Sequence, residues 1–235
     1  MSSESQETSP DLSLWHSQSI AQRVAQLMLP DHVKLVAVSK TFPALAIRAA
    51  YAAGIRDFGE NKIQEAVAKQ TELTDLTDIT WHFIGHLQTN KVRKAIEHFD
   101  WIHSVHTLKL ARRIDHIAAE LSRFPICCLQ VKLLEDPNKY GWSEPEIWQA
   151  LPDLSSLSHI KLEGIMAIPP YGLEKQETQR VFEQAYGLGQ ALKSHQEYPL
   201  PIRYFSMGMS QDFPLAIAAG ANIIRLGTSL FGSRG

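Results

Sequence analysis

The feature that most constrains this chain is its regular alternation of short apolar runs with helix-like segments. About eight apolar runs follow one another at a spacing of roughly 25 to 30 residues. No shift in composition and no linker rich in Pro, Gly or Ser divides the 235 residues. This pattern predicts a closed (β/α)8 barrel or an open doubly wound sheet. Because no G-x-G-x-x-G follows the first run, we predict the α/β fold of a single (β/α)8 TIM-type barrel.

The predicted strands are the apolar runs that end in polar residues or glycine. They cover residues 33–38, 55–61 (running into a loop), 81–84, 101–105, 126–134, 162–168, 202–205 and 222–226. An extra helix at 14–29 precedes the first strand and stops at Pro30. Residues 1–11 are rich in Ser, Glu and Gln, so we expect a disordered tail followed by one barrel domain at 12–235.

Composition excludes several classes of function. The formal net charge of −2 gives no general attraction to nucleic acid or to an anionic membrane. No apolar stretch approaches the roughly 18 residues that span a bilayer, and residues 1–11 lack the apolar core of a signal peptide. We therefore expect a cytoplasmic protein. Cys127 and Cys128 are adjacent in a predicted strand and point to opposite faces, so we interpret them as small core residues.

In a barrel of this kind the residues at the strand exits share one mouth. The predicted mouth residues are Lys40, Asn61, His86, His103, Lys132, Met166, Ser206 and the group at 225–228. The first strand ends abruptly in Lys40, and a lysine partly removed from water becomes a usable amine nucleophile. The alternative is a surface lysine that caps a strand.

Two segments suggest a phosphate site. Ser206, Met207, Gly208, Met209 and Ser210 lie between the seventh strand and a helix, and Gly227 and Thr228 leave the eighth. Barrels often bind phosphate between these two loops, where backbone N–H groups and hydroxyls are available. An ordinary helix-capping turn and a glycine needed only for barrel closure are the alternatives.

Arg225 lies within an apolar strand, where an unpaired guanidinium would be costly. Its partner is either a buried carboxylate, such as Asp57 or Glu60, or a ring nitrogen of a ligand. Asn61 is either a helix cap or a ligand contact, and Met166 either core or a shelf for a flat ring. The histidines show no metal-binding spacing, and His86 is either a ligand contact or a mouth residue that does not touch the ligand. A lysine, a phosphate cradle and an arginine for a ring nitrogen together describe a site for pyridoxal 5′-phosphate (PLP).

The chain resembles a known family along nearly all of its length after the tail. The motifs are residues 38–41, 58–61 with Gln64 and Glu65, 81–85 with 87–88 and 90–91, 138–141, 164–169, 206–210 and 225–232. They resemble those of the PLP homeostasis protein family (YggS/PROSC/PLPBP type). The resemblance implies a monomeric barrel of PLP fold type III, similar to the N-terminal domain of alanine racemase.

The resemblance also implies roles for individual residues. Lys40 would form a Schiff base with PLP, and Arg225 would face the pyridine nitrogen. The phosphate would be held by Ser206, Ser210, Gly227, Thr228 and the Met207 amide. Asn61 and Met166 would line the ring, Ile84 is a further cofactor-binding residue, and Lys139 would accept or hand on PLP. Lys62 and Phe42 depart from the family pattern at positions expected on the rim, which puts transfer or charge steering in question.

The resemblance implies a PLP carrier and homeostasis factor that acts on B6 vitamers and on amino-acid and keto-acid pools, with apo-PLP enzymes as recipients and without dedicated turnover. Racemases of this fold take a tyrosine from a second domain, and the chain ends at Gly235 just after the barrel closes. The alternative is an amino-acid racemase with Tyr140, Tyr171 or a water as second base. A third possibility is a phosphate-binding barrel in which Lys40 forms aldolase-type Schiff bases without PLP.

Overall fold

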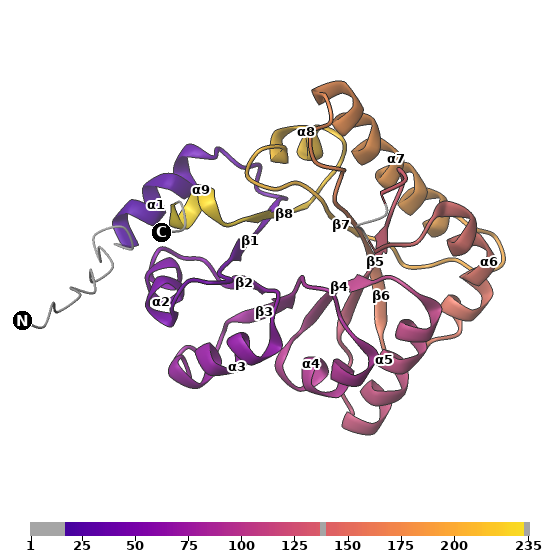
Figure 1. Cartoon of the computed structure of the whole chain (residues 1–235), viewed down its shortest axis with the longest axis horizontal. Coiled ribbons are helices and arrows are strands. Elements are labelled where there is room, and N and C mark those ends of the chain that lie inside the picture. The colour runs from indigo at the N-terminus through magenta and orange to yellow at the C-terminus, as the bar shows by residue number, and fades with distance from the viewer. Residues whose placement is uncertain (1–16, 137–139, 233–235) are drawn as a thin grey trace, which may run out of the picture.

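The computed structural model describes residues 17–136 and 140–232, which contain a closed barrel of eight parallel strands surrounded by helices (Figure 1). The strands are β1 (Lys34–Val38), β2 (Asp57–Glu60), β3 (Thr80–Phe83), β4 (Trp101–Val105), β5 (Ile126–Val131), β6 (Lys161–Ala167), β7 (Tyr204–Ser206) and β8 (Ile223–Leu226). They pair in chain order, and β1 closes on β8 with Val36 opposite Arg225. The predicted (β/α)8 barrel is confirmed.

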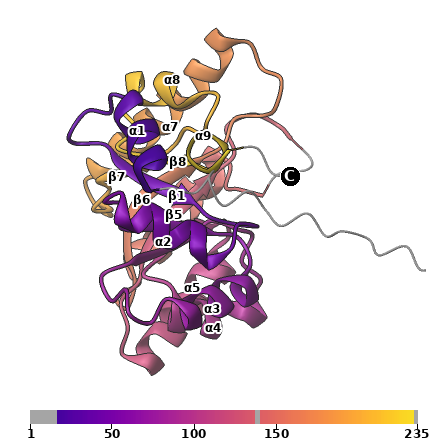
Figure 2. The same cartoon turned by 90° about the vertical axis from the view of Figure 1, so that its left-hand side faces the viewer.

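The helices follow the strands around the outside of the barrel. They are α1 (Ser17–Gln26), α2 (Ala44–Ala52), α3 (Ile63–Glu72), the short η2 (Thr89–Lys91), α4 (Val92–His98), α5 (Leu108–Leu121), α6 (Glu144–Ser155), α7 (Lys175–Lys193), α8 (Phe213–Ala218) and α9 (Thr228–Phe231). The extra helix α1 packs against α2 and α9 (Figures 1 and 2), where Arg23 Nη1 donates to the Leu230 carbonyl at 2.5 Å. It ends earlier than predicted, since Met28 adopts a φ of 47°.

The side chains along each strand point alternately into two packed layers, one outside and one inside the barrel. The outward side chains join the helices, and the inward ones fill the barrel with Val36, Trp101, Cys128, Met166 and Ile223. Cys127 belongs to the outer layer and Cys128 to the interior, which confirms that they are core residues on opposite faces. Burial raises the pKa of the Cys128 thiol to about 12, so this sulfur stays protonated at neutral pH.

Two predicted strand ends and one predicted mouth residue need correction. β5 stops at Val131, and beyond it the Lys132 N–H donates to the Trp142 carbonyl at 2.8 Å while the Trp142 N–H donates back to the Gln130 carbonyl at 2.8 Å. β7 begins later than predicted, at Tyr204. His103 was expected in the mouth but lies in the middle of β4, fully buried inside the barrel.

None of the helices in the described ranges has both the length and the apolar character needed to cross a membrane.

Candidate functional site

Lys40 leaves the barrel beside the loop that follows β8. It lies two residues beyond the end of β1 and is half-buried. A Cβ placed on Gly227 would lie 3.2 Å from the Val38 carbonyl oxygen, so the two chain segments run in close contact. Lys40 and the Gly227–Thr228 segment therefore both follow neighbouring strands at the carboxyl-terminal end of the barrel, where such folds place their chemistry.

The residue after Lys40 has a strained backbone. Thr41 has a φ of 68°, in the left-handed region that a β-branched residue rarely adopts. Its N–H donates to Glu65 Oε1 at 2.5 Å, and the Phe42 N–H donates to the Ser39 carbonyl at 3.0 Å. A strained backbone of this kind persists only where the surrounding structure holds it. Here the two hydrogen bonds fix the backbone next to the candidate nucleophile.

A buried ion cluster supports the same turn. The Lys69 ammonium lies 2.7 Å from both Glu60 Oε1 and Glu65 Oε1, and it donates to the Ser39 carbonyl at 2.8 Å. The Ser39 hydroxyl donates to Glu60 Oε1 at 2.6 Å. Residues of α3 and β2 thus bind Ser39 and Thr41, the two chain neighbours of Lys40. Sequence reasoning missed Lys69, which reads as a solvent-facing helix residue, although its i,i+4 spacing from Glu65 was a visible signal.

The pKa values of the two carboxyl groups shift in opposite directions. Burial raises the pKa of Glu60, and the hydrogen bond from Lys69 offsets only part of that effect. For Glu65 the partial burial is outweighed by the hydrogen bonds from Lys69 and Thr41, which leave its pKa below the usual range. Glu60 Oε2 and Asn61 Oδ1 are buried atoms without a hydrogen-bond partner among the described residues. Two unsatisfied acceptors therefore lie next to each other in sequence at the end of β2.

Arg225 is buried inside the barrel with 4% of its surface exposed. Its Nη1 donates to the carbonyl and the hydroxyl oxygen of Ser206, at 2.5 and 2.7 Å, and Nη2 lies 3.3 Å from the Ala167 carbonyl. Burial lowers its pKa to about 10, which leaves the guanidinium charged at neutral pH. The alternative carboxylate partners are wrong, because Asp57 pairs with Lys34 and Glu60 pairs with Lys69.

A chain of polar side chains runs through the barrel from Arg225. We call the following five residues the interior chain: Asp57, His82, His103, Ser206 and Arg225. Both histidines and Ser206 are fully buried. His82 and His103 thus both point into the packed interior of the barrel.

The loops after β7 and β8 approach each other at two hydroxyls. Ser210 Oγ and Thr228 Oγ1 are 3.1 Å apart. Gly208 has a φ of 90°, and a side chain there would collide with Ala216 and Phe213. The Met209 N–H is already bound by Asp212 Oδ1 at 2.6 Å. The predicted pairing of these loops is thus present as two adjacent hydroxyls beside Gly227.

Two of the predicted phosphate donors are engaged elsewhere. The Met207 N–H donates to the Ile223 carbonyl at 3.0 Å, and its side chain is buried in the outer layer. The Ser206 hydroxyl belongs to the interior chain. Both placements differ from the prediction, because the Met207 N–H bonds to the backbone of β8 and the Ser206 hydroxyl contacts the side chains of His103 and Arg225.

Asn61, Ile84 and Met166 lie at the ends of three strands. Asn61 and Ile84 are half-buried, whereas Met166 belongs to the barrel interior with 1% of its surface exposed. A Cβ on Gly59 would lie 3.1 Å from Val36 and 3.3 Å from Ile84, so this part of the wall is tightly filled.

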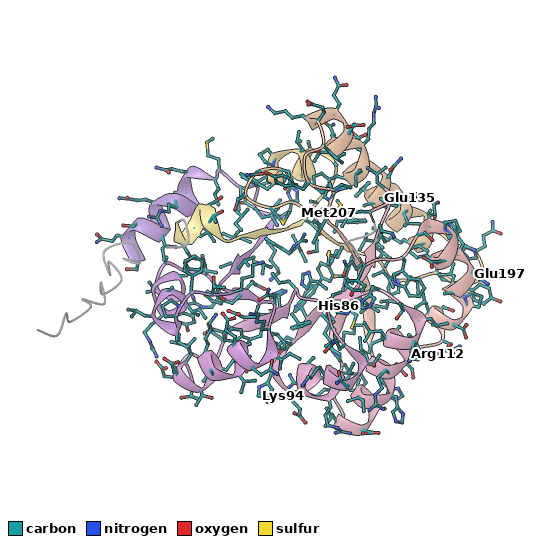
Figure 3. All side chains as sticks on the ribbon, viewed as in Figure 1. His86, Lys94, Arg112, Glu135, Glu197 and Met207 are labelled. Carbon is teal, nitrogen blue, oxygen red and sulfur yellow. The ribbon has the colours of Figure 1, made fainter. Side chains whose placement is uncertain are left out.

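His86 lies at the mouth in an aromatic cluster. Its ring stacks on Tyr140 with centroids 3.8 Å apart, and His106 lies 4.7 Å away. Figure 3 shows His86 and Met207 near the centre of the ring of elements, with Arg112 and Glu197 on its outside. Partial burial and the neighbouring His106 lower the pKa of His86. Tyr171, the other candidate second base, is 95% exposed, and Lys139 lies outside the described residues.

The positions that depart from the family pattern differ in exposure. Phe42 was expected on the rim but is buried, 4.9 Å from the Phe231 ring, while Lys62 is exposed at the start of α3. Among the described residues, no three or more His, Cys, Asp or Glu side chains are grouped to hold a metal ion.

Comparisons with known proteins show the family and the fold to which the chain belongs. The family model for the alanine racemase N-terminal domain matches residues 16–235. A Synechocystis protein named pyridoxal phosphate homeostasis protein is 50% identical over 88% of this chain and 94% of its own. The structure of Synechococcus elongatus PipY with PLP bound is 56% identical, with a TM-score of 0.86, and covers 91% of this chain and 100% of that one.

An alanine racemase from Clostridium difficile shares the fold at 17% identity, with a TM-score of 0.71, over 93% of this chain and 60% of that one. The match therefore leaves part of the racemase chain without a counterpart in this chain. The chain belongs to the pyridoxal phosphate homeostasis protein family, whose barrel is of the alanine racemase N-terminal type.

Proposed function

We propose that this protein binds PLP covalently through Lys40 and acts as a PLP carrier and homeostasis factor. The observation that carries the proposal is the pairing of β1 with β8. This pairing supports the proposal, because Lys40 follows β1, while the neighbouring β8 carries Arg225 and is followed by Gly227 and Thr228. An amine, a donor for a ring nitrogen and donors for a phosphate thus come from two adjacent strands.

The residues present fit PLP. Ser210, Gly227 and Thr228 would hold the phosphate, and Arg225, which can only donate hydrogen bonds, would face the pyridine nitrogen. The buried acceptor of Asn61 lacks a partner within the described residues, as expected if a ligand hydroxyl supplies the missing hydrogen. Ile84 and Met166 would line the ring. We leave the Met207 amide and the Ser206 hydroxyl out of the phosphate site, because both have other partners.

The relatives support a carrier more than an enzyme. The Synechocystis relative is named for PLP homeostasis, and PipY was solved with PLP bound. PLP supplies an electrophilic aldehyde and a ring that withdraws electrons when it is bound. The chain's own residues would hold it, and Arg225, as a donor to the ring nitrogen, would keep that nitrogen unprotonated and weaken the withdrawal. We propose one monomeric, cytoplasmic domain at 12–235, with apo-PLP enzymes as recipients and without dedicated turnover.

Titration with PLP tests the proposal. We expect stoichiometric binding with an absorbance band near about 420 nm that borohydride removes, as lysine imine chemistry requires. Lys40→Ala should abolish the band while the fold, followed by circular dichroism, survives. A band that persists in this variant contradicts the assignment, and no band in the wild-type protein contradicts PLP binding.

Solvent-deuterium exchange at Cα of a panel of amino acids separates a carrier from a racemase. Turnover of about 1 per second or faster is typical of enzymes. We expect exchange far slower than this at saturating PLP, and a rate in the enzyme range for any amino acid would contradict the carrier.

A further inference from the structure

The interior chain links the barrel floor to Arg225 through continuous short contacts. Asp57 Oδ1 lies 2.9 Å from His82 Nε2, and His82 Nδ1 lies 2.9 Å from His103 Nε2. His103 Nδ1 lies 2.8 Å from Ser206 Oγ, which lies 2.7 Å from Arg225 Nη1. At its lower end Asp57 also accepts from Lys34, at 2.8 Å.

The chemistry of its two ends fixes the direction of every hydrogen bond in this chain. A guanidinium can only donate, so Ser206 must offer its oxygen to Arg225. An ionised carboxylate can only accept, so His82 must carry its hydrogen on Nε2. Although burial alone would raise the pKa of Asp57, the hydrogen bonds from His82 and Lys34 lower it, which keeps the carboxylate ionised.

The two histidines complete one consistent arrangement. Burial lowers the pKa of His82. Burial also lowers the pKa of His103, and the neighbouring His82 and Arg225 add to this effect. Both rings are therefore neutral at neutral pH. His82 Nδ1 then accepts from His103 Nε2–H, and His103 Nδ1 accepts from the Ser206 hydroxyl. With neutral rings and an ionised Asp57 no other arrangement satisfies all of the contacts.

We propose that His82, His103 and Ser206 are positioning residues for Arg225, which hold its guanidinium at the ligand through a chain of hydrogen bonds anchored on Asp57. This proposal rests on the proposed function, in which Arg225 faces the ring nitrogen of PLP. His82 touches neither Arg225 nor the mouth, so its effect on the ligand passes through the chain. The ring electronics of PLP are thereby set in part from the barrel floor.

The tautomers of the two histidines test the chain in the ligand-free protein. Histidine-selective ¹⁵N NMR at neutral pH should show both His82 and His103 as Nε2–H tautomers, assigned by substituting each in turn. Either ring as the Nδ1–H tautomer, or protonated, overturns the proposal. This measurement needs no PLP, so it decides the chain even if the wild-type protein lacks the band near about 420 nm, which would overturn only the proposed function.

Two serine variants then test the effect on PLP. Ser206→Ala removes the only hydroxyl between His103 and Arg225, whereas Ser104→Ala removes a hydroxyl that is equally buried but has no partner in the described structure. We expect Ser206→Ala to lower PLP affinity about tenfold and to shift the absorbance maximum, as the loss of a hydrogen bond to a charged group implies. Ser104→Ala should change neither, and an unchanged Ser206→Ala protein overturns the proposal.

A third variant, His82→Leu, tests transmission along the chain. It should shift the absorbance maximum of bound PLP in the same direction as Ser206→Ala and disturb the His103 tautomer. Loss of packing alone would lower stability without a shared spectral shift. A folded His82→Leu protein with the wild-type spectrum therefore overturns the proposal.

Discussion

The ammonium of Lys69 lies 2.7 Å from Glu60 Oε1, and both side chains are buried. The same ammonium binds the Ser39 carbonyl, and Glu65, its other partner, binds the Thr41 N–H. A charge cluster thus holds the backbone on both sides of Lys40, including the strained Thr41. Breaking a buried ion pair by removing one partner leaves an uncompensated charge.

We predict that Lys69→Met lowers the free energy of unfolding by about 3 kcal/mol, as expected when one partner of a buried ion pair is removed. It should also slow the reaction of Lys40 with PLP, because the turn is no longer held. Urea unfolding and the rate of band formation measure the two effects. Lys62→Met, at an exposed position at the start of the same helix, is the control. A loss below about 1 kcal/mol would show that the cluster contributes little.

We predict that the protein loses stability as pH falls below about 6.5, the histidine pKa of an unfolded chain. His82 and His103 have lowered pKa values when folded, so the unfolded state binds more protons. The loss should reach about 1.4 kcal/mol per pH unit for each histidine, until pH falls to the folded-state pKa. Glu60, whose pKa burial raises, acts in the opposite sense.

Urea unfolding between about pH 7.5 and about pH 5.5 measures this slope, a window above the range in which Asp57 titrates. The double variant His82→Leu/His103→Leu should have a smaller slope, and His32→Gln, at an exposed residue, should keep it. Equal slopes in the wild-type protein and the double variant would contradict the prediction.

We predict that Gly85→Ala is strongly destabilising, by about 2 kcal/mol or more, as expected when a core is overpacked. Its Cβ would lie 2.2 Å from the Asn61 carbonyl oxygen, a backbone atom that cannot turn aside. Gly187→Ala, in the middle of α7 with open space around the new Cβ, should instead stabilise the protein by up to about 1 kcal/mol. Thermal unfolding compares the two, and equal effects would contradict the close approach.

We predict that substitutions at the proposed phosphate site lower the affinity for PLP but not for pyridoxal. Ser210→Ala and Thr228→Ala should each weaken PLP binding about tenfold, as for a hydrogen bond to a charged group. Neither should change the weaker binding of pyridoxal, which has no phosphate. Ser158→Ala, in the loop before β6 at the opposite end of the barrel, is the control. Equal losses for PLP and pyridoxal would place the two hydroxyls elsewhere than at the phosphate.

The sequence predicted the barrel well because its signals are local. Apolar runs that end in Lys40, Asn61 or Gly227 mark strand exits, and the closure of β1 on β8 follows from the fold class. The predictions were wrong where the local sequence pattern differs from the tertiary structure. Leu133 and Leu134 extend the apolar run of β5 beyond its last ladder residue, and Phe42 is buried against Phe231, which lies far along the chain.

The interior chain and the Lys69 cluster escaped prediction because they depend on contacts between distant residues. His103 bonds to Ser206 across 103 positions, and Lys69 bonds to Ser39 across 30. The alternation of inward and outward residues did contain a signal, since it places His82 and His103 inside neighbouring strands. The partner of Arg225 could not be read from composition, because hydroxyl and carbonyl oxygens satisfy it instead of a carboxylate.

Peptide mass spectrometry of the protein reduced with borohydride after incubation with PLP tests the central claim most directly. We predict one reduced adduct per chain, on the peptide that contains Lys40. An adduct on another lysine, or adducts spread over several lysines with Lys40 unmodified, would contradict the account.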